Sequence, residues 1–214
     1  MIPSLLRIEE ERILSEQVLN GSVLDLGGER GSHYQRLLGG DHTFYTVNVS
    51  KQACPDLLHD LELPLPLNDA SYDHALLMNV LEHIFGYHAF LKEACRVVRP
   101  GGTLTILVPF LFPYHPSPQD FHRFSATALE RELTLVGCTE IKVEALGSGV
   151  FAARLLMIDR LLPIPLRYFN YTISRHVVRL LDMSFAALSR ASSKRYQRSD
   201  YALGYIVTAT VARV

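Results

Sequence analysis

Four side chains that could move a proton or bind a polar ligand lie within residues 115–123. They are His115, Asp120, His122 and Arg123. An imidazole can act as a general base, and a carboxylate with a guanidinium can orient it or clamp a polar substrate. The alternative is that Asp120 and Arg123 form an internal ion pair that only holds the shape of the loop. His115, Asp120 and His122 could bind a metal by residue type, but we predict no metal.

A second stretch with chemical meaning is the glycine-rich segment VLDLGGERG at residues 23–31. An apolar run that ends in an acid and continues into glycines is typical of a buried strand leading into a ligand-binding loop. Glycine lets the backbone turn sharply and approach a ligand without a Cβ in the way. Residues 32–38 can start a helix whose N-terminal amides face the same ligand.

The composition is that of an ordinary globular domain. The chain has 214 residues, of which 48% are hydrophobic and 20% charged, and its net charge is −1. This size allows one domain with a substantial core, and the charge gives no bias toward nucleic acid. The cysteines at 54, 95 and 138 lack metal-ligand spacing, and no secretory signal fits the charged N-terminal region. We therefore expect a cytoplasmic protein with reduced cysteines.

Strand-like and helix-like segments alternate along the first two thirds of the chain. Strands are predicted at residues 23–26, 44–49, 74–78 and 104–108, with a short one near 57–60, and helices over 4–19 and 87–98. This alternation predicts an α/β fold with a mostly parallel sheet and helices on both faces. Ligands bind beyond the carboxyl ends of such strands. The residues at these ends are Asp25, Asn48, Asp60, Asn79 and Pro109.

The C-terminal third differs from the rest in charge and spacing. Residues 139–146 and 205–213 are predicted strands, and the connection between them, residues 147–203, is too long for a plain loop. Between residues 150 and 198 there are nine Arg or Lys residues and two Asp, a net charge of +7. We predict a basic helical insertion before the last strand, within one domain formed by residues 1–146 and 204–214.

The insertion has the pattern of an amphipathic helix. On a helical projection Arg175, Arg179 and Asp182 share one half, and apolar residues such as Leu180 and Leu188 share the other. A basic amphipathic helix fits an anionic membrane surface, which would place the protein at the inner face of the membrane. The alternatives are a cap over the substrate cleft and a homodimer interface.

The order of the motifs resembles that of the class I S-adenosylmethionine-dependent methyltransferases. The resemblance is carried by DLGGERG at 25–31, HDL at 59–61, LPL at 65–67, NVLEH at 79–83 and RVVRPGG at 96–102. It implies a Rossmann-like class I methyltransferase sandwich with S-adenosylmethionine as cofactor. Residues 109–125 are similar to a bacterial branch associated with glycan or cell-envelope biosynthesis.

The resemblance also implies roles for single residues. Cofactor contacts are expected from Asp25, Gly27, Gly28, Gly31, Asn48, Asp60, Leu61 and Asn79. Asp25 would organise the glycine loop, and Asp60 would accept a hydrogen bond from the adenine amine. Two positions depart from the family pattern: Glu29 replaces a glycine, and Asn48 replaces an acid that binds the ribose hydroxyls. For Glu82 and His83, at the start of the next helix, a structural role is at least as expected as a catalytic one.

These implications lead to one functional hypothesis and one alternative. The hypothesis is methyl transfer to a small-molecule or lipid-linked acceptor, with His115 as base and Asp120 and Arg123 beside it. The alternative is a non-catalytic methyltransferase-like protein that regulates a partner, which Glu29 and Asn48 favour. A nucleic-acid substrate is not expected, because the chain has VPFL at 108–111 where such enzymes often carry an Asn/Asp-Pro-Pro-aromatic motif.

Overall fold

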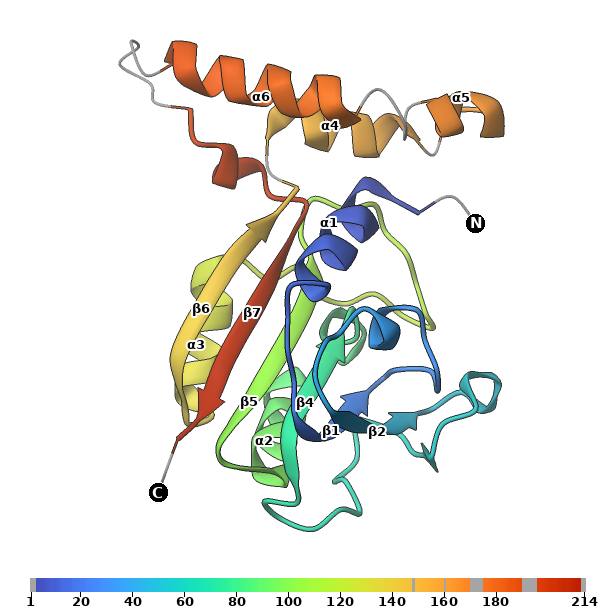
Figure 1. Ribbon diagram of the computed structural model, residues 1–214, viewed down its shortest axis with the longest axis vertical. Helices are drawn as coiled ribbons and strands as arrows, with labels where there is room; N and C mark the ends of the chain where they lie inside the picture. The colour runs from blue at the N-terminus through green and yellow to red at the C-terminus, as the bar shows by residue number, and fades with distance from the viewer. Residues whose placement is uncertain (1–2, 148, 160, 170–174, 190–195, 213–214) are drawn as a thin grey trace.

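A seven-stranded sheet forms the centre of the protein (Figure 1). The computed structural model describes residues 3–147, 149–159, 161–169, 175–189 and 196–212. The strands are β1 (Gly21–Leu26), β2 (His42–Asn48), β3 (Leu57–Leu58), β4 (Tyr72–Met78), β5 (Val98–Pro109), β6 (Cys138–Leu146) and β7 (Gly204–Val211). Their order across the sheet is β3-β2-β1-β4-β5-β7-β6.

The strand order reverses at β1, which places a ligand crevice at its carboxyl end. β1 pairs in parallel with β2 on one side and with β4 on the other. β3 and β5 continue the parallel sheet outward, while β7 is antiparallel to both β5 and β6. Ligands bind in open α/β sheets at such a reversal, where two loops leave in opposite directions. The predicted mostly parallel sheet is confirmed.

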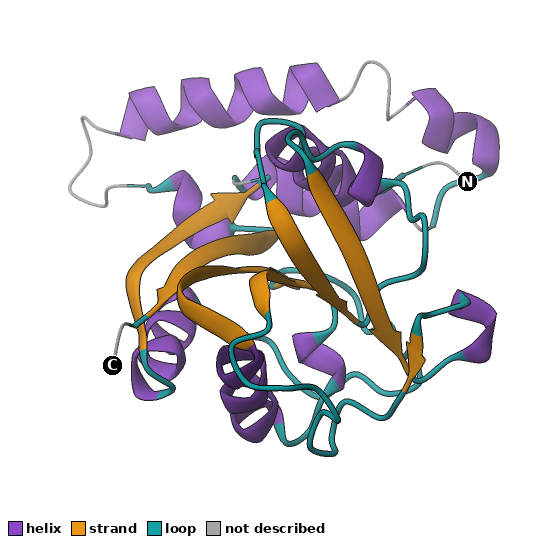
Figure 2. Ribbon diagram, turned by 60° about the horizontal axis from the view of Figure 1, so that its bottom comes forward, coloured by secondary structure: helices purple, strands orange, loops and turns teal. Residues whose placement is uncertain are grey.

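Helices cover both faces of the sheet, as the sequence predicted (Figure 2). On one face α2 (Tyr87–Val97) and α3 (Ala126–Leu135) enclose a core that includes Leu24 and Leu129. On the other face α1 (Leu5–Leu14) and α4 (Val150–Asp159) enclose a second core that includes Leu6, Val23 and Leu156. Neighbouring residues of β1, such as 23 and 24, serve opposite cores because side chains alternate along a strand.

The N-terminal helix is shorter than the predicted helix over residues 4–19. It begins after Ser4, whose hydroxyl accepts a hydrogen bond from the backbone N–H of Arg7 at 3.1 Å, and it ends at Leu14. The next residue, Ser15, donates its hydroxyl to the carbonyl of Arg12, closing the last turn. Leu6, Leu14 and the carboxylate-bearing Glu10 are buried on its inner face.

The helix predicted over residues 32–38 is wrong. The structure has one short 3-10 turn there, η1 (Tyr34–Arg36). The reason lies in two side chains that turn back to the glycine loop: Tyr34 and Gln35 both donate to Asp25, and Gln35 also binds the loop backbone. Because of these contacts, a short turn replaces a full helix.

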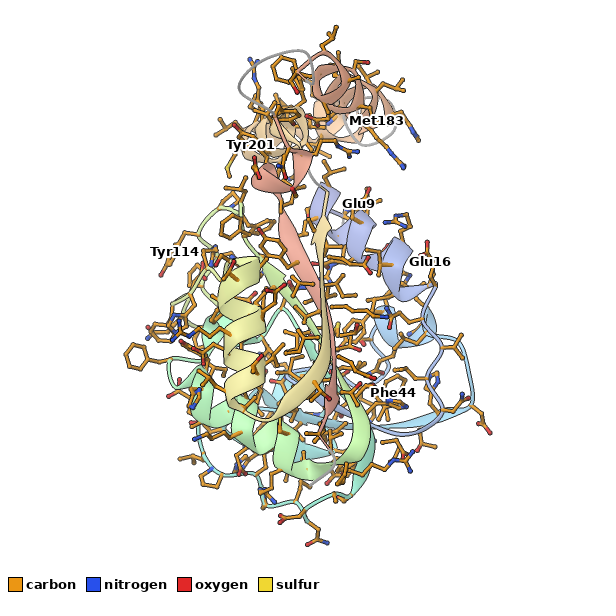
Figure 3. All side chains as sticks on the ribbon, turned by 90° about the vertical axis from the view of Figure 1, so that its left-hand side faces the viewer. Glu9, Glu16, Phe44, Tyr114, Met183 and Tyr201 are labelled. Atoms are coloured by element: carbon orange, nitrogen blue, oxygen red, sulfur yellow. The ribbon has the colours of Figure 1, made fainter. Side chains whose placement is uncertain are left out.

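The predicted insertion between β6 and β7 is present as three helices at one end of the molecule (Figure 1). They are α4, α5 (Ile164–Phe169) and α6 (Arg175–Ser189). Gly204, the first residue of β7, pairs with Leu146 at the end of β6 and with Pro109 at the end of β5. The insertion connects β6 to β7, so it leaves the sheet at the carboxyl end of β5. Figure 3 shows Met183 of the insertion above Glu9 of α1. Four of the nine basic residues, Arg160, Arg190, Lys194 and Arg195, lie outside the described residues.

The face of α6 that packs against the rest of the insertion is not the apolar half that the helical projection predicted. The side chains of Val178, Asp182 and Ala186 are the less exposed stripe of this helix, and Asp182 is fully buried against the start of α4. Leu180 is 62% exposed and Leu188 is 75% exposed. Most of the apolar half of α6 therefore faces solvent. No helix among the described residues is long and apolar enough to cross a bilayer.

Candidate functional site

A cavity of about 800 Å³ lies at the carboxyl ends of the parallel strands. Its walls come from the glycine loop after β1, the ends of β2 and β4, the segment after β3, and the loop that follows β5. The lining residues include Gly27, Asn48, Asp60, Leu61 and Asn79. Five residues predicted from separate motifs are thus brought to one cavity. Gln119 and Phe121 of the loop after β5 also line the cavity.

The glycine loop needs its glycines for steric reasons. Gly27 has a φ of +89°, and a Cβ at this position would lie 2.6 Å from Cγ2 of Val80. A Cβ on Gly28 would lie 2.2 Å from a carboxylate oxygen of Asp25. Gly31 has space around it, but its φ of +71° is a conformation that residues with a Cβ rarely adopt. These positions therefore form a cradle that larger residues would fill or distort.

Asp25 is connected to this loop through Tyr34 and Gln35. Its Oδ2 accepts hydrogen bonds from the Tyr34 hydroxyl at 2.6 Å and from Nε2 of Gln35 at 2.7 Å. Gln35 in turn accepts a hydrogen bond from the Gly31 N–H and donates one to the Glu29 carbonyl. Burial raises the pKa of Asp25 to about 6, against the lowering effect of its two donors. Its Oδ1 is buried without a hydrogen-bond partner among the described residues.

Asn48 uses its amide to hold the glycine loop. Its Nδ2 donates to the carbonyl oxygens of Gly27 at 2.7 Å and Gly28 at 3.1 Å, and its Oδ1 accepts from the Ser50 N–H. A carboxylate could not donate these two bonds, which gives a physical reason for Asn in place of the family's acid. Asn48 still lines the cavity, so its carbonyl oxygen has a lone pair left for a ligand hydroxyl.

Asn79, at the end of β4, is connected to the N-terminal helix. It adopts a φ of +53°, and its Nδ2 donates to the buried carboxylate of Glu10 at 3.1 Å. Burial raises the pKa of Glu10, although Arg7 at 3.3 Å and the Asn79 amide favour its ionised form. Helix α1 is therefore part of the site, which the sequence did not predict.

A second cavity of about 310 Å³ lies between α1 and the glycine loop. Its lining includes Arg7 from α1 together with Gly27, Gly28 and Glu29. The Glu29 residue is exposed, and its neighbour Arg30 pairs with Asp56. Arg7 thus places a positive charge on the side of the cradle where Glu29 brings a negative one.

The loop after β5 holds His115, Asp120 and Arg123 together. Arg123 binds Asp120 with two nitrogens, one of them 2.6 Å from Oδ2, and Asp120 also accepts a hydrogen bond from the His115 N–H at 3.0 Å. Hydrogen bonding to Arg123 holds the pKa of Asp120 well below its usual range. Asp120 and Arg123 therefore form the internal ion pair considered from the sequence, and this pair fixes the position of His115.

His115 points toward a pair of residues that the sequence left undecided. Its Nε2 lies 3.6 Å from Oε1 of Glu82, and Nε2 of His83 lies 3.6 Å from the same oxygen. Glu82 is fully buried, and neither of its carboxylate oxygens has a hydrogen-bond partner among the described residues. The pKa of His115 is raised, chiefly by Glu82 and further by Asp120, while burial acts in the other direction.

His122 does not belong to this cluster. Its Nε2 contacts the Phe85 carbonyl at 3.3 Å, and its ring packs edge-on against Tyr87. The loop is fixed near these residues because the N–H groups of Phe121 and His122 both donate to the Glu82 carbonyl. The set of His115, Asp120 and His122 considered as metal ligands from the sequence is therefore not assembled.

Comparison with known proteins agrees with this geometry. A family model described as "Methyltransferase domain" matches residues 20–106. A probable S-adenosylmethionine-dependent methyltransferase from Mycolicibacterium smegmatis is 33% identical over 84 residues, which are 38% of this chain and 33% of that protein. The chain therefore matches about a third of the length of this curated relative.

Solved structures with the same fold cover nearly the whole chain. A S-adenosylmethionine-dependent methyltransferase from Archaeoglobus fulgidus superposes with a TM-score of 0.59 at 15% identity, covering 97% of this chain and 94% of that one. The [4+2]-cyclase SpnF superposes with a TM-score of 0.61 at 17% identity, covering 97% and 83%. Residues 20–106 therefore match a methyltransferase domain family, and the fold around them is the one that these solved structures share.

The curated relative is named as an S-adenosylmethionine-dependent methyltransferase, and the residues of the present site fit that cofactor. The loop at Gly27 and Gly28 can follow this path along the cavity because no Cβ is present to clash with Val80 or Asp25. Asp60 and Leu61, at the adenine position of the family motif, line the same cavity as Asn79. Asp60 is exposed and accepts a hydrogen bond from the Glu62 N–H, while Leu61 is buried. These residues, with Asn48, would hold the adenosine part, and the glycine loop would hold the methionine part.

Sequence reasoning missed three residues of the site, Arg7, Glu10 and Gln35, and left the role of a fourth, Glu82, undecided. Arg7 and Glu10 lie on α1, far in sequence from every motif, and Gln35 lies in a turn that was expected to be a helix. A polar residue on the otherwise apolar inner face of residues 5–14 was the available signal for Glu10. The role of Glu82 could not be found from its spacing, because it depends on how the loop after β5 folds back.

Proposed function

We propose that this protein transfers a methyl group from S-adenosylmethionine to a small-molecule or lipid-linked acceptor. One observation carries the proposal: His83, a member of the Glu82–His83–His115 cluster, lines the same cavity as Gly27, Asp60 and Asn79. The cofactor cradle and the cluster therefore open to a common space. A donor and an acceptor held in that space can react without leaving the protein.

The chemistry asks little of the protein beyond position and proton removal. S-adenosylmethionine supplies a methyl group on a sulfonium, so that the acceptor's bond to the methyl carbon forms as the carbon–sulfur bond breaks and sulfur keeps the electron pair. A hydroxyl acceptor must also lose its proton. We assign this task to His115, whose backbone N–H donates to Asp120 and whose Nε2 lies 3.6 Å from Glu82, in the cluster that reaches the cavity through His83. Such proton transfer contributes about 10²- to 10⁴-fold to a rate.

A labelling experiment tests this function. The purified protein is incubated with S-adenosylmethionine carrying a tritiated methyl group and with lipid and soluble fractions of bacterial cells. We expect label in an acceptor with the wild type, none with Gly27→Val, and a roughly 10²- to 10⁴-fold lower rate with His115→Ala. His122→Ala, on the same loop but outside the cluster, is the control and should keep its rate. Near-normal turnover in His115→Ala would show that the proton leaves by another route.

We further propose that the insertion brings the protein to an anionic membrane surface. Exposed apolar side chains gather on it, among them Leu161, Ile164, Leu180 and Leu188, which are 82%, 71%, 62% and 75% exposed. Exposed arginines such as Arg154 and Arg179 accompany them. Apolar groups that enter the lipid boundary beside cations that meet anionic headgroups are the combination that binds such surfaces. The insertion lies at the ligand edge of the sheet, so a lipid-linked glycan precursor would arrive beside the cavity.

A second candidate is a non-catalytic protein that uses this fold to regulate a partner. It is favoured by Glu29 and Asn48, the two positions that depart from the family pattern. The two candidates differ in their response to the labelling experiment and to S-adenosylmethionine itself. A regulator that does not use the cofactor would bind none, whatever the acceptor supplied.

A further inference from the structure

We propose that Glu82, His83 and His115 form a binding site for a divalent transition-metal cation. One carboxylate oxygen and two imidazole nitrogens, the potential ligand atoms, all lie within 4.8 Å of one another. Two of the three edges of this triangle, from Oε1 of Glu82 to each Nε2, are 3.6 Å. Ligands about 2.1 Å from a tetrahedral cation are separated by about 3.4 Å, so the two edges at Glu82 already have nearly the required length.

The hydrogen bonds of the two histidines leave the correct nitrogens free. Nδ1 of His83 contacts the carbonyl oxygen of Gln119, and Nδ1 of His115 lies 3.1 Å from the carbonyl oxygen of Pro113 and 3.3 Å from Asp120. These oxygens can only accept, which favours the proton on Nδ1 of each neutral ring, and the one donor near Nδ1 of His115, Nη2 of Arg123, is farther away at 3.4 Å. Both Nε2 lone pairs then face Glu82. Metal-binding histidines show this arrangement, with the outer nitrogen donating to a carbonyl or a carboxylate.

Glu82 supplies the independent observation that a ligand is missing. Glu82 is fully buried, and neither of its carboxylate oxygens has a hydrogen-bond partner among the described residues. A buried carboxylate without a hydrogen bond is costly, and a bound cation offsets that cost. At 3.6 Å the neighbouring nitrogens are too far away to act as hydrogen-bond donors. The carboxylate therefore faces two lone pairs, which a cation satisfies together.

The donor set indicates which cations fit. Two imidazoles and one carboxylate suit Zn²⁺, Co²⁺ or Fe²⁺, whereas Mg²⁺ and Ca²⁺ prefer oxygen ligands alone. Three protein ligands leave at least one coordination position open, as in catalytic rather than structural sites. Since His83 lines the large cavity, the open position is expected on that side.

The task of the cation rests on the proposed function, but its binding does not. An acceptor oxygen bound to the open position would have a lowered pKa and lose its proton more readily. His115 would then act as a ligand rather than as a base, and the acceptor's proton would pass to water, because the cation lowers the pKa of the bound oxygen. The methyl donor, the acceptor position and the products stay the same.

Equilibrium dialysis of the chelator-treated full chain against Zn²⁺, followed by metal analysis, tests the site without any acceptor. We expect one cation per chain, with an affinity lowered roughly 100-fold or more in Glu82→Gln and in His115→Ala and unchanged in His122→Ala. Co²⁺ should give a visible absorption band that Glu82→Gln abolishes, and Mg²⁺ should not compete. Thermal unfolding and S-adenosylmethionine binding of each variant show that it is folded.

Two results would overturn the site. One is no stoichiometric Zn²⁺ binding at micromolar concentration, and the other is equal affinity in the wild type and Glu82→Gln. Failure of the proposed function would give a different result. The chain would then bind Zn²⁺ but not S-adenosylmethionine, so the metal site would stand and methyl transfer would be excluded.

Discussion

Asp182 in the insertion and Glu82 in the site are both completely buried carboxylates, yet their surroundings are opposite. Asp182 accepts hydrogen bonds from the N–H groups of Phe151 and Ala152 and from the Tyr196 hydroxyl, at 3.0 to 3.1 Å. It thereby satisfies the first turn of α4, where the helix dipole favours a negative charge. Glu82 has no such partners among the described residues.

The difference separates a structural group from a functional one. A carboxylate whose lone pairs are all used stabilises the fold and has nothing left for a ligand. A carboxylate that is buried with its lone pairs unused lowers stability, and the protein keeps it where a ligand completes it. Asp25 lies between these limits, because its Oδ2 accepts two hydrogen bonds while its Oδ1 accepts none among the described residues.

The substitution Glu82→Gln tests most strongly whether Glu82 is a functional residue and Asp182 a structural one. We expect turnover to fall by about 10²- to 10⁴-fold, because the group that completes the cluster is lost. Stability should change by no more than about 1 kcal/mol, since no hydrogen bond is removed and a buried charge disappears. Turnover with labelled cofactor and urea unfolding measure the two effects. A stability loss of several kcal/mol would make Glu82 a structural residue like Asp182.

Asp25, the carboxylate with one satisfied oxygen, is tested by the pH dependence of the unfolding free energy in the wild type and in Asp25→Asn. Because the folded-state pKa of Asp25 is raised from 3.8 to about 6, the native protein binds the proton more tightly than the unfolded chain. The stability that this proton contributes is present below pH 3.8 and is lost as pH rises through about 6. The unfolding free energy of the wild type relative to Asp25→Asn should therefore fall by about 2 kcal/mol between pH 4 and pH 7. Parallel stability curves would contradict the assignment.

Asp182→Ala should have the opposite profile to Glu82→Gln. Two backbone N–H groups and a hydroxyl lose their acceptor, so local stability of the insertion should fall by roughly 2–3 kcal/mol. Hydrogen exchange of α4 amides measures this, with exposed Ser184→Ala on the same helix as the control. S-adenosylmethionine binding should not change, because Asp182 lies outside the cofactor cavity. Unchanged exchange in α4 would show that the buried hydrogen bonds of Asp182 do not hold the helix.

The smallest effects are expected from the surface of the insertion. Neutralising Arg154 and Arg179 with glutamine should weaken binding to vesicles containing phosphatidylserine by about 1 kcal/mol per residue at low salt, and less at high salt. Replacing Leu180 and Leu188 with serine should weaken binding at every salt concentration. Cosedimentation measures both, and neutral vesicles are the control. Equal binding to neutral and anionic vesicles would leave a cap or a homodimer as the role of these helices.

The parts of the molecule that sequence predicts are those encoded locally. Alternating strands and helices gave the sheet, and the family motifs gave Gly27, Asp60 and Asn79, because each lies directly after a strand that sets its place. The net charge of residues 150–198 likewise marked the insertion. In contrast, the contact of Glu10 with Asn79 and the meeting of His115 with Glu82 depend on how distant segments fold back. The orientation of α6 was missed because Asp182, a charged residue, occupies its buried stripe.

The central claim is that the carboxyl edge of the sheet is a S-adenosylmethionine site, and calorimetric titration with this cofactor tests it most directly. The account predicts one molecule bound per chain with a dissociation constant of roughly 1–100 µM. Gly27→Val should abolish binding, because its side chain would occupy the cradle beside Val80. Glu29→Gly, which removes a negative charge from the same loop, should leave the affinity unchanged or tighten it. No binding at millimolar cofactor by the folded wild-type protein would contradict the account.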